Sequence, residues 1–220
     1  MVKHLLRDLE HLKKEILAVG SLVEHAIRKA TVALVEGRQE LGEEVIAGDA
    51  EIDAREVAVE EECLKVLALH QPVAADLRFI ITVLKVNNDL ERMGDLATNI
   101  AARACHLAGA RLPVPKDFGL MVDRVRSMVR DSLDALVSVD VALARSIYAA
   151  DDEVDAMHGR MFGHVQEEIR RDPANIERGI QVLSVSKHLE RIADLATNIA
   201  EDVEFMVTGE IIRHRAEPIE

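Results

Sequence analysis

The sequence predicts an all-α protein built from two tandem three-helix bundles, with six long helices related by internal duplication. Three observations lead to this fold class. Small and apolar residues recur at helical spacing over long stretches, and a twelve-residue segment occurs once in each half. Aromatic residues make up only 2% of the 220 residues, and there are five prolines. Sheet proteins, by contrast, draw on aromatic residues and are interrupted by frequent turns.

The first half contains three helical patterns. In the first, small and apolar side chains recur at steps of four and three, and we expect Gly37 to end the helix. The second covers about residues 40–70 and ends before Pro72, because the residue preceding a proline is disfavoured in the helical region. Pro72 then fits the first turn of a third helix, which we expect to run to about Ala108.

The second half repeats this plan after a proline-containing linker. We expect helices at about 117–139 and 141–170, an interruption at Pro173 that matches Pro72, and a last helix to about Val207. The predicted boundaries are 1–110 for the first bundle, 111–116 for the linker, 117–209 for the second bundle and 210–220 for a tail.

Charge and composition exclude several classes of protein. The chain has 27 basic and 40 acidic residues, a net charge of −13, which does not favour nucleic acid or anionic lipid as a partner. No stretch approaches the roughly 20 apolar residues of a membrane span, and the N-terminus lacks a signal-peptide core. Cys63 and Cys105 are isolated, which is typical of reduced thiols in a cytoplasmic protein.

The duplication is visible in the residues themselves. Residues 90–101 read LERMGDLATNIA and residues 189–200 read LERIADLATNIA, so ten of twelve positions are identical. A weaker acidic pair, at 48–53 and 150–155, lies on the preceding helix of each half. Repeated segments at fixed separation indicate two copies of one structural unit.

The third helix presents two faces. The stripe expected to pack the core consists of Phe79, Val83, Val86, Leu90, Met93, Ala97, Ile100 and Ala104. The opposite side begins apolar and becomes acidic where the repeat begins, through Leu77, Ile81, Leu84, Asn88, Glu91, Asp95 and Asn99. The last helix shows the same change, through Ile180, Leu183, Lys187, Glu190, Asp194, Asn198 and Glu201.

These acidic faces have two interpretations. In so acidic a chain, carboxylate pairs one turn apart are expected by chance and usually form a solvated surface, on which Arg92 and Arg191 could pair with Asp95 and Asp194. However, like charges one turn apart disfavour a helix, and here they occur twice at equivalent places. Oxygen-rich facing helices bind Mg²⁺, Ca²⁺, Mn²⁺ or iron, whereas zinc is less typical without His or Cys. The duplication therefore favours metal binding.

Other chemical motifs are weak. The Glu-x-x-His motif of di-iron proteins has its nearest match at Asp155 to His158, but the first half has Glu56 at the place of His158. We interpret His158 as a surface or interface residue. The sequence has no phosphate-binding loop, nucleophile elbow or EF-hand loop. We therefore expect no enzymatic activity.

The repeated segments resemble the PhoU family of bacterial phosphate transport and signalling regulators over essentially the whole chain. The resemblance rests on HQPVAADLR at 70–78, the two E-x-x-x-D motifs and the two D-x-x-x-D pairs. It implies paired three-helix bundles that carry multinuclear iron or zinc clusters on their acidic faces, although Mg, Mn or Ca also suit the ligands. The metal ligands that it implies are Asp49, Asp53, Glu91 and Asp95 in the first half and Asp151, Asp155, Glu190 and Asp194 in the second.

Three further residues are candidates as ligands or as their hydrogen-bond partners: Asn99, Asn198 and Glu201. The first copy departs from the family pattern, because Ala102 stands where the second has Glu201. We therefore expect the first site to hold fewer metals or to bind them more weakly.

The resemblance also implies a function. Such a protein is a cytoplasmic negative regulator of phosphate uptake and phosphate-starvation signalling. It acts by binding the transporter ATPase and its sensor histidine kinase, forms a homo-oligomer such as a dimer, and meets the membrane only through those partners. Two alternatives remain: a metal-dependent hydrolase or di-metal oxidase that uses the carboxylates as an active site, and a helical scaffold without metal.

Overall fold

The computed structural model describes residues 2–107 and 114–210. Within these residues there are six α-helices and no strand, which confirms the predicted all-α fold class. A short 3₁₀ helix at Pro173–Asn175 precedes the last α-helix. The helices are α1 (Val2–Glu36), α2 (Gln39–His70), α3 (Ala74–His106), α4 (Lys116–Ser138), α5 (Val141–Arg171) and α6 (Ile176–Thr208).

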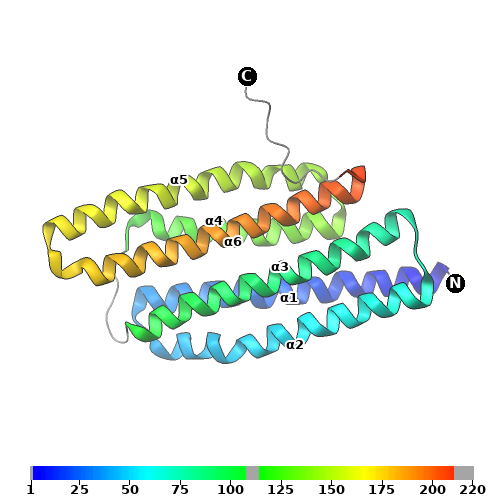
Figure 1. Ribbon diagram of the computed structural model, residues 1–220, viewed down its shortest axis with the longest axis horizontal. Helices are drawn as coiled ribbons and strands as arrows, with labels where there is room; N and C mark the ends of the chain where they lie inside the picture. Colours follow the sequence, from blue (N-terminus) through cyan, green and yellow to red (C-terminus); the bar gives the residue numbers. More distant parts are fainter. Residues whose placement is uncertain (1, 108–113, 211–220) are drawn as a thin grey trace, which may run out of the picture.

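The helices form two three-helix bundles that lie side by side along the length of the molecule (Figure 1). Helices α1, α2 and α3 pack on one another, as do α4, α5 and α6, and the bundles meet through α3 with α6 and α1 with α4. Helices α3 and α6 run antiparallel. Near the start of α3, Arg78 Nε donates to the Met206 carbonyl at 2.8 Å, and Lys85 Nζ lies 3.0 Å from Asp202 Oδ1.

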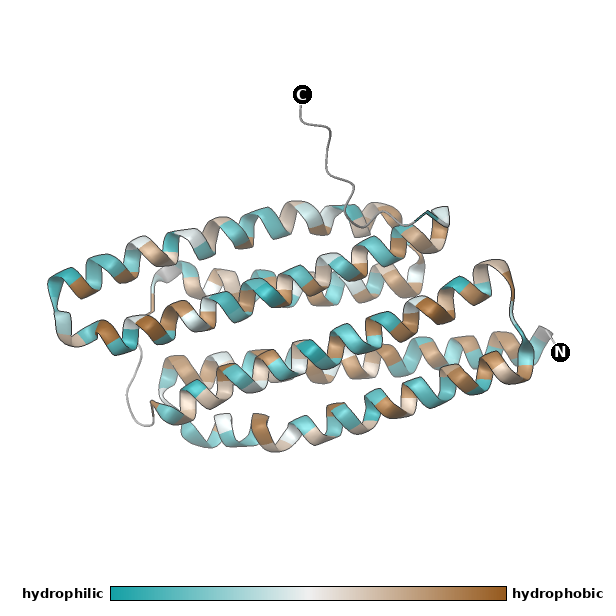
Figure 2. Ribbon diagram, in the orientation of Figure 1, coloured by the Kyte–Doolittle hydropathy of each residue, from teal (hydrophilic) through white to brown (hydrophobic). Residues whose placement is uncertain are grey.

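The predicted core stripe of α3 is buried along its whole length. Figure 2 shows hydrophobic positions alternating with hydrophilic ones along each helix, as expected of amphipathic helices. Fully burying one large aliphatic side chain contributes about 1.5–3 kcal/mol. Close approach of α1 to α4 requires a residue without a side chain, because a methyl group at Gly20 would lie 2.0 Å from Leu133 Cδ1.

The two prolines that seemed equivalent in the sequence have different roles. Pro72 is not in the first turn of α3, which begins two residues later at Ala74. Val73 takes an extended conformation there, and Pro72 is buried in the connection. Pro173 does open a helical turn, which is capped by Asp172 accepting a hydrogen bond from the backbone of Ala174 at 3.0 Å.

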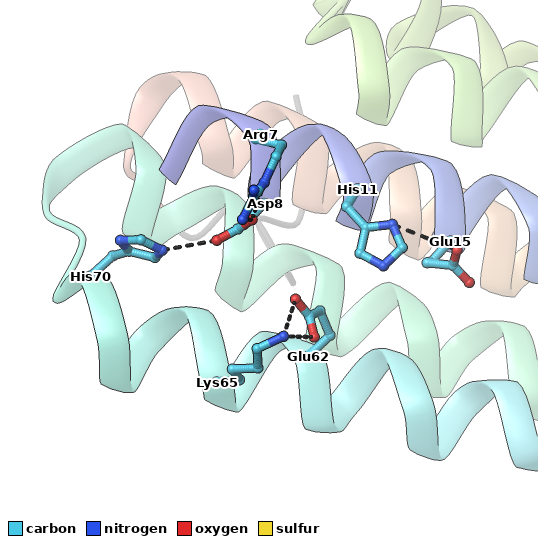
Figure 3. A network of polar contacts seen from close by, with 7 residues as sticks. All are labelled: Arg7, Asp8, His11, Glu15, Glu62, Lys65 and His70. Carbon is cyan, nitrogen blue, oxygen red and sulfur yellow. Dashed lines mark hydrogen bonds and ion pairs between the residues drawn. The ribbon is translucent and has the colours of Figure 1, made fainter. Parts of the chain in front are cut away.

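The turn between α2 and α3 is tied to the start of α1 by polar contacts (Figure 3). His70 Nε2 lies 3.0 Å from Asp8 Oδ2, and Arg7 bonds the other oxygen of the same carboxylate. Hydrogen bonds from His70 and Arg7 hold the pKa of Asp8 below its usual value. Side chains from α1 and α2 therefore hold this end of the bundle together.

The helix bounds lie close to the expected ones. Gly37 ends α1 with a positive φ of 68°, and α4 begins at Lys116, the last residue of the predicted linker. Residues 111–113 of the predicted linker and 211–220 of the predicted tail lie outside the described residues, and the predicted domain bounds stay a prediction. None of the helices in the described part of the chain is both long and apolar enough to cross a bilayer.

Candidate metal centre

The carboxylates of the first half come from two helices that pack together. We define the first cluster as Asp49 and Asp53 of α2 with Glu91 and Asp95 of α3. Burial raises the pKa of Asp49, and Asp53 and Asp95 raise it further, whereas a hydrogen bond with Thr98 lowers it. The pKa of Glu91 is raised by burial and then by Asp95, Asp53 and other nearby carboxylates. The two motifs of the first half therefore form one electrostatic unit.

The second half brings the equivalent residues together. The second cluster consists of Asp151 and Asp155 of α5 with Glu190 and Asp194 of α6. Burial raises the pKa of Asp151 to about 7, with further contributions from Asp155 and Asp194. Its Oδ1 atom is buried and has no hydrogen-bond partner. This oxygen is poorly solvated and has no compensating hydrogen bond from the described residues.

One cation of the chain already lies at the second cluster. Lys187 Nζ is 2.5 Å from Glu190 Oε1, one turn earlier on α6. The pKa of Asp194 is raised by burial and by Glu190, and the charge of Lys187 lowers it. The lysine side chain is about half exposed, so it can move into solvent when another cation takes its place.

The repeated segments also face each other between the bundles. A cavity of about 300 Å³ lies between α3 and α6, which touch elsewhere along their length. The predicted outer residues Asn99 and Asn198 line it together with Asp95 and Asp194, so these asparagines lie toward the partner bundle as well as beyond the clusters. The remaining lining residues are Arg92, Leu96, Arg191 and Leu195.

The two arginines of the repeat behave differently. Arg92 lies 3.9 Å from Asp89, on the preceding turn, whereas the charge of Arg191 lowers the pKa of Asp194, as the surface interpretation expects. Glu201 lies close enough to Tyr148 of α5 to help raise the pKa of that phenol. Glu201 therefore continues the acidic face of α6 along the same side as the second cluster.

The carboxylates of each cluster lie apart from one another. In residues 2–107 and 114–210, no three His, Cys, Asp or Glu side chains converge closely enough to hold one. Carboxylates of like charge repel one another. A cation bound between them would remove this repulsion and allow them to approach. The orphaned Asp151 oxygen and the all-oxygen donor sets fit a hard or borderline cation. The eight carboxylates would hold it, and metal binding stays a prediction.

Sequence reasoning missed one kind of neighbour. Thr98 bonds Asp49, whereas Thr197 Oγ1 donates to its own helix backbone, to the Asp194 carbonyl at 2.6 Å. Both threonines belong to the identical LATN portion of the repeat, and this repetition could have marked them as neighbours of the carboxylates. Glu56 was also passed over, although it adds to the charge felt by Glu91.

Both halves of the chain match a known family. The PhoU domain model matches the chain twice, at residues 16–104 and 118–203. The phosphate-specific transport system accessory protein PhoU homolog of Aquifex aeolicus is 41% identical over 212 residues, which cover 96% of both chains. The homolog of Pseudomonas putida is 38% identical over 94% of this chain and 82% of its own.

Two crystal structures share the architecture. PhoU from Pseudomonas aeruginosa superposes with a TM-score of 0.85 at 35% identity, covering 93% of this chain and 99% of the other. The phosphate transport system regulatory protein PhoU from Streptococcus pneumoniae gives 0.84 at 32% identity, covering 94% and 99%. Matches of this extent include both bundles and both clusters. The chain therefore belongs to the PhoU family.

Proposed function

We propose that this protein is an accessory regulator of a phosphate transport system, which restrains phosphate uptake and starvation signalling when phosphate is plentiful. The observation that carries the proposal is the likeness to PhoU proteins over both domain copies. Its relatives are named as accessory proteins of phosphate-specific transport. A non-enzymatic role agrees with a sequence that has none of the catalytic motifs considered above.

The proposed partners are the transporter ATPase and its sensor histidine kinase. Regulation by contact needs exposed surface that can be covered, and α3 offers Leu77 and Ile81, with exposed fractions of 38% and 36%. The net charge of −13 favours partners with basic surfaces. A cytoplasmic location and a homodimer are part of the same proposal.

The second part of the proposal is that the two carboxylate clusters bind metal ions. Multinuclear iron or zinc is the expected form, and Mg, Mn or Ca are alternatives. A bound cation supplies positive charge that stabilises facing carboxylates on two helices. Asp49 and Asp53 would then be linked to α3, and Asp151 and Asp155 to α6. This would fix the packing of α2 and α5, which form an outer part of each bundle (Figure 1).

Genetics and binding test the regulatory role. Deleting the gene should derepress phosphate-starvation responses in phosphate-rich medium, and the purified protein should associate with the ATPase or the kinase. A Leu77→Asp, Ile81→Asp variant, which alters exposed positions only, tests whether that face of α3 is used. An unchanged starvation response after deletion, with metal-dependent phosphoester hydrolysis or oxygen activation by the purified protein, would replace the regulator with the hydrolase or oxidase alternative.

A further inference from the structure

Helices α3 and α6 face each other through one stripe of helically spaced residues in each repeat. On α3 the stripe consists of Asp89, Arg92, Leu96, Asn99 and Arg103. On α6 it consists of the equivalent residues of the second copy, His188, Arg191, Leu195, Asn198 and Asp202. The middle of both stripes lines the cavity between the helices. Because the helices are antiparallel, the start of one stripe lies opposite the end of the other.

One end of this interface is acidic. The stripes meet there at Asp89 of α3 and Asp202 of α6, which are both buried. Lys85 Nζ lies 3.0 Å from Asp202 Oδ1, and Arg92 lies 3.9 Å from Asp89. Such partners are needed, because burying a carboxylate without one is costly. Two cations of α3 therefore already offset the two aspartates.

At the opposite end the same positions of the repeat are basic. Arg103 of α3 is the counterpart of Asp202, and His188 of α6 is the counterpart of Asp89. Arg191 lies one turn after His188 on the same stripe. Burial lowers the pKa of His188, and the positive charges of Arg103 and Arg191 lower it further, so both arginines lie near the imidazole. We define the basic end of the interface as these three side chains.

The basic end lacks the compensation found at the acidic end. Both ring nitrogens of His188 are buried without a hydrogen-bond partner. Within residues 2–107 and 114–210, neither Arg103 nor Arg191 forms a side-chain hydrogen bond or an ion pair. The counterpart of Lys85 is Ser184, so no carboxylate takes the corresponding place. Cations without a counter-charge are unexpected in a chain of net charge −13, and they indicate a place for an anion from outside the chain.

The two carboxylates that line the cavity lie to one side of the stripes. Asp95 and Asp194 are each about 60° around their helix from the preceding arginine of the repeat. Their charges act on the clusters, because Asp95 raises the pKa of Asp49 and Asp194 raises that of Asp151. Asn99, in contrast, belongs to the stripe and lines the cavity, so its amide can donate to a ligand there.

We propose that a tetrahedral oxyanion with two negative charges, of the phosphate or sulfate class, binds at the basic end between Arg103 and Arg191. Asn99 and His188 supply further N–H donors. Guanidinium groups match such an ion, because their N–H groups form a planar fork and stay protonated. The cavity of about 300 Å³ has room for an ion of this size with water. The ion joins α3 to α6, and its binding depends neither on metal ions nor on the regulatory role.

Calorimetry and NMR on the full chain test this site. The protein is stripped of metal with a chelator and dialysed into a chloride buffer, so that phosphate cannot bind through a cation at the clusters. Inorganic phosphate should bind saturably, with one ion per chain. The side-chain N–H signals of Arg103 and Arg191 and the imidazole signals of His188 should shift together. Sulfate should compete, because it has the same shape and charge, whereas acetate should not.

Matched substitutions locate the ion. Arg103→Gln and Arg191→Gln should each weaken phosphate binding by about tenfold or more, because each removes a charged donor. Arg191→Lys keeps the charge but loses the fork, so its affinity should fall between. Arg92→Gln is the matched control, since Arg92 is the counterpart of Arg191 toward the acidic end, and it should bind nearly as wild type. Arg170→Gln, which removes an exposed arginine of α5, controls for net charge.

A double-mutant cycle tests whether one ion contacts both helices. The losses in Arg103→Gln and Arg191→Gln should not add, because the two arginines share a single ligand. Additive losses would mean two separate surface contacts and would overturn the site. Circular dichroism confirms that each variant is folded, as expected for substitutions of exposed side chains.

Three other results would also overturn the proposal. They are the absence of saturable phosphate binding in metal-free wild type, full affinity in the Arg103→Gln, Arg191→Gln double variant, and an equal loss in Arg92→Gln and Arg191→Gln. Glycerol 3-phosphate distinguishes the source of the oxyanion. Binding as tight as that of phosphate identifies the phosphoryl group of a small ester, and weaker binding identifies the free ion.

Discussion

The two acidic clusters each contain three aspartates and one glutamate at the same spacing, yet the residues around them differ. In the first bundle, a hydrogen bond with Thr98 partly offsets the burial of Asp49. In the second, Thr197 turns to the helix backbone, and Asp151 keeps a buried oxygen without a partner. The same motif therefore leaves the charged aspartate partly stabilised in the first bundle and less stabilised in the second. The second cluster has the greater need of an external cation.

The ends of the clusters differ as well. At the second, Glu201 lies near Tyr148, and the positions equivalent to these in the first are Ala102 and Ile46. The helices of the first cluster also pack closely beside it. Gly94 stands where the second copy has Ala193, and a methyl group at Gly94 would lie 3.2 Å from Ile52 Cδ1 and 3.7 Å from Asp49 Oδ1. The two copies thus share the four carboxylates and differ in the residues next to them.

The largest effect should come from removing ligands. Glu91→Ala with Asp95→Ala should abolish metal binding by the first bundle, and Glu190→Ala with Asp194→Ala should abolish it in the second. Wild-type protein should lose metal from the first site sooner on dialysis, because that copy lacks a counterpart of Glu201. Metal analysis before and after dialysis measures both. Equal metal content in wild type and a folded quadruple variant would contradict the assignment.

The pH dependence of metal-free protein should differ between the clusters. The folded-state pKa of Asp151 is about 7, above its ordinary value of 3.8, so between these values the folded protein binds more protons than the unfolded chain. Stability should therefore fall as the pH rises from about 4 to 7. Asp151→Asn should flatten this part of the curve and raise the melting temperature at neutral pH.

Melting curves in chelator from pH 4 to 8 provide the measurement. Asp49→Asn is the matched variant, and its effect should be smaller because the Thr98 hydrogen bond already favours the charged form of Asp49. If both variants shift the curve equally, the proposed difference between the clusters is wrong.

The sequence predicted the six helices, and it placed the acidic pairs one turn apart on each helix, because both follow from periodicity and repetition. The assignment of these carboxylates as metal ligands stays a prediction. The sequence did not predict the roles of Pro72 or Thr197, since these depend on which backbone or side-chain atom lies nearby after packing. Nor did it place the two asparagines in one cavity between α3 and α6. This placement depends on α3 packing antiparallel to α6 across the two bundles. The spacing of residues within either half does not reveal that packing.

A smaller effect should follow from removing the threonine hydroxyl next to each cluster. Thr98→Val removes a hydrogen bond that favours the charged form of Asp49, so the pKa of Asp49 should rise further above its ordinary value, as that of Asp151 does. Thr197→Val should leave the pKa of Asp151 unchanged, because its hydroxyl bonds the Asp194 carbonyl. Carbon-detected NMR titration of the two carboxyl groups measures this. Equal shifts in both variants would show that Thr98 has no special role.

The smallest effect should come from restoring the missing carboxylate of the first copy. Ala102 is exposed on α3, one turn beyond Asn99 and two turns beyond Asp95. A glutamate there adds negative charge at the end of the first cluster and leaves the core untouched, so Ala102→Glu should slow metal loss on dialysis. Because the new group is solvent-exposed, its contribution should stay below about 1 kcal/mol, a few-fold change in rate. Ala102→Gln supplies equal length without charge and should behave as wild type. Metal retained equally by both variants would show that side-chain length, and not charge, sets the difference between the two copies.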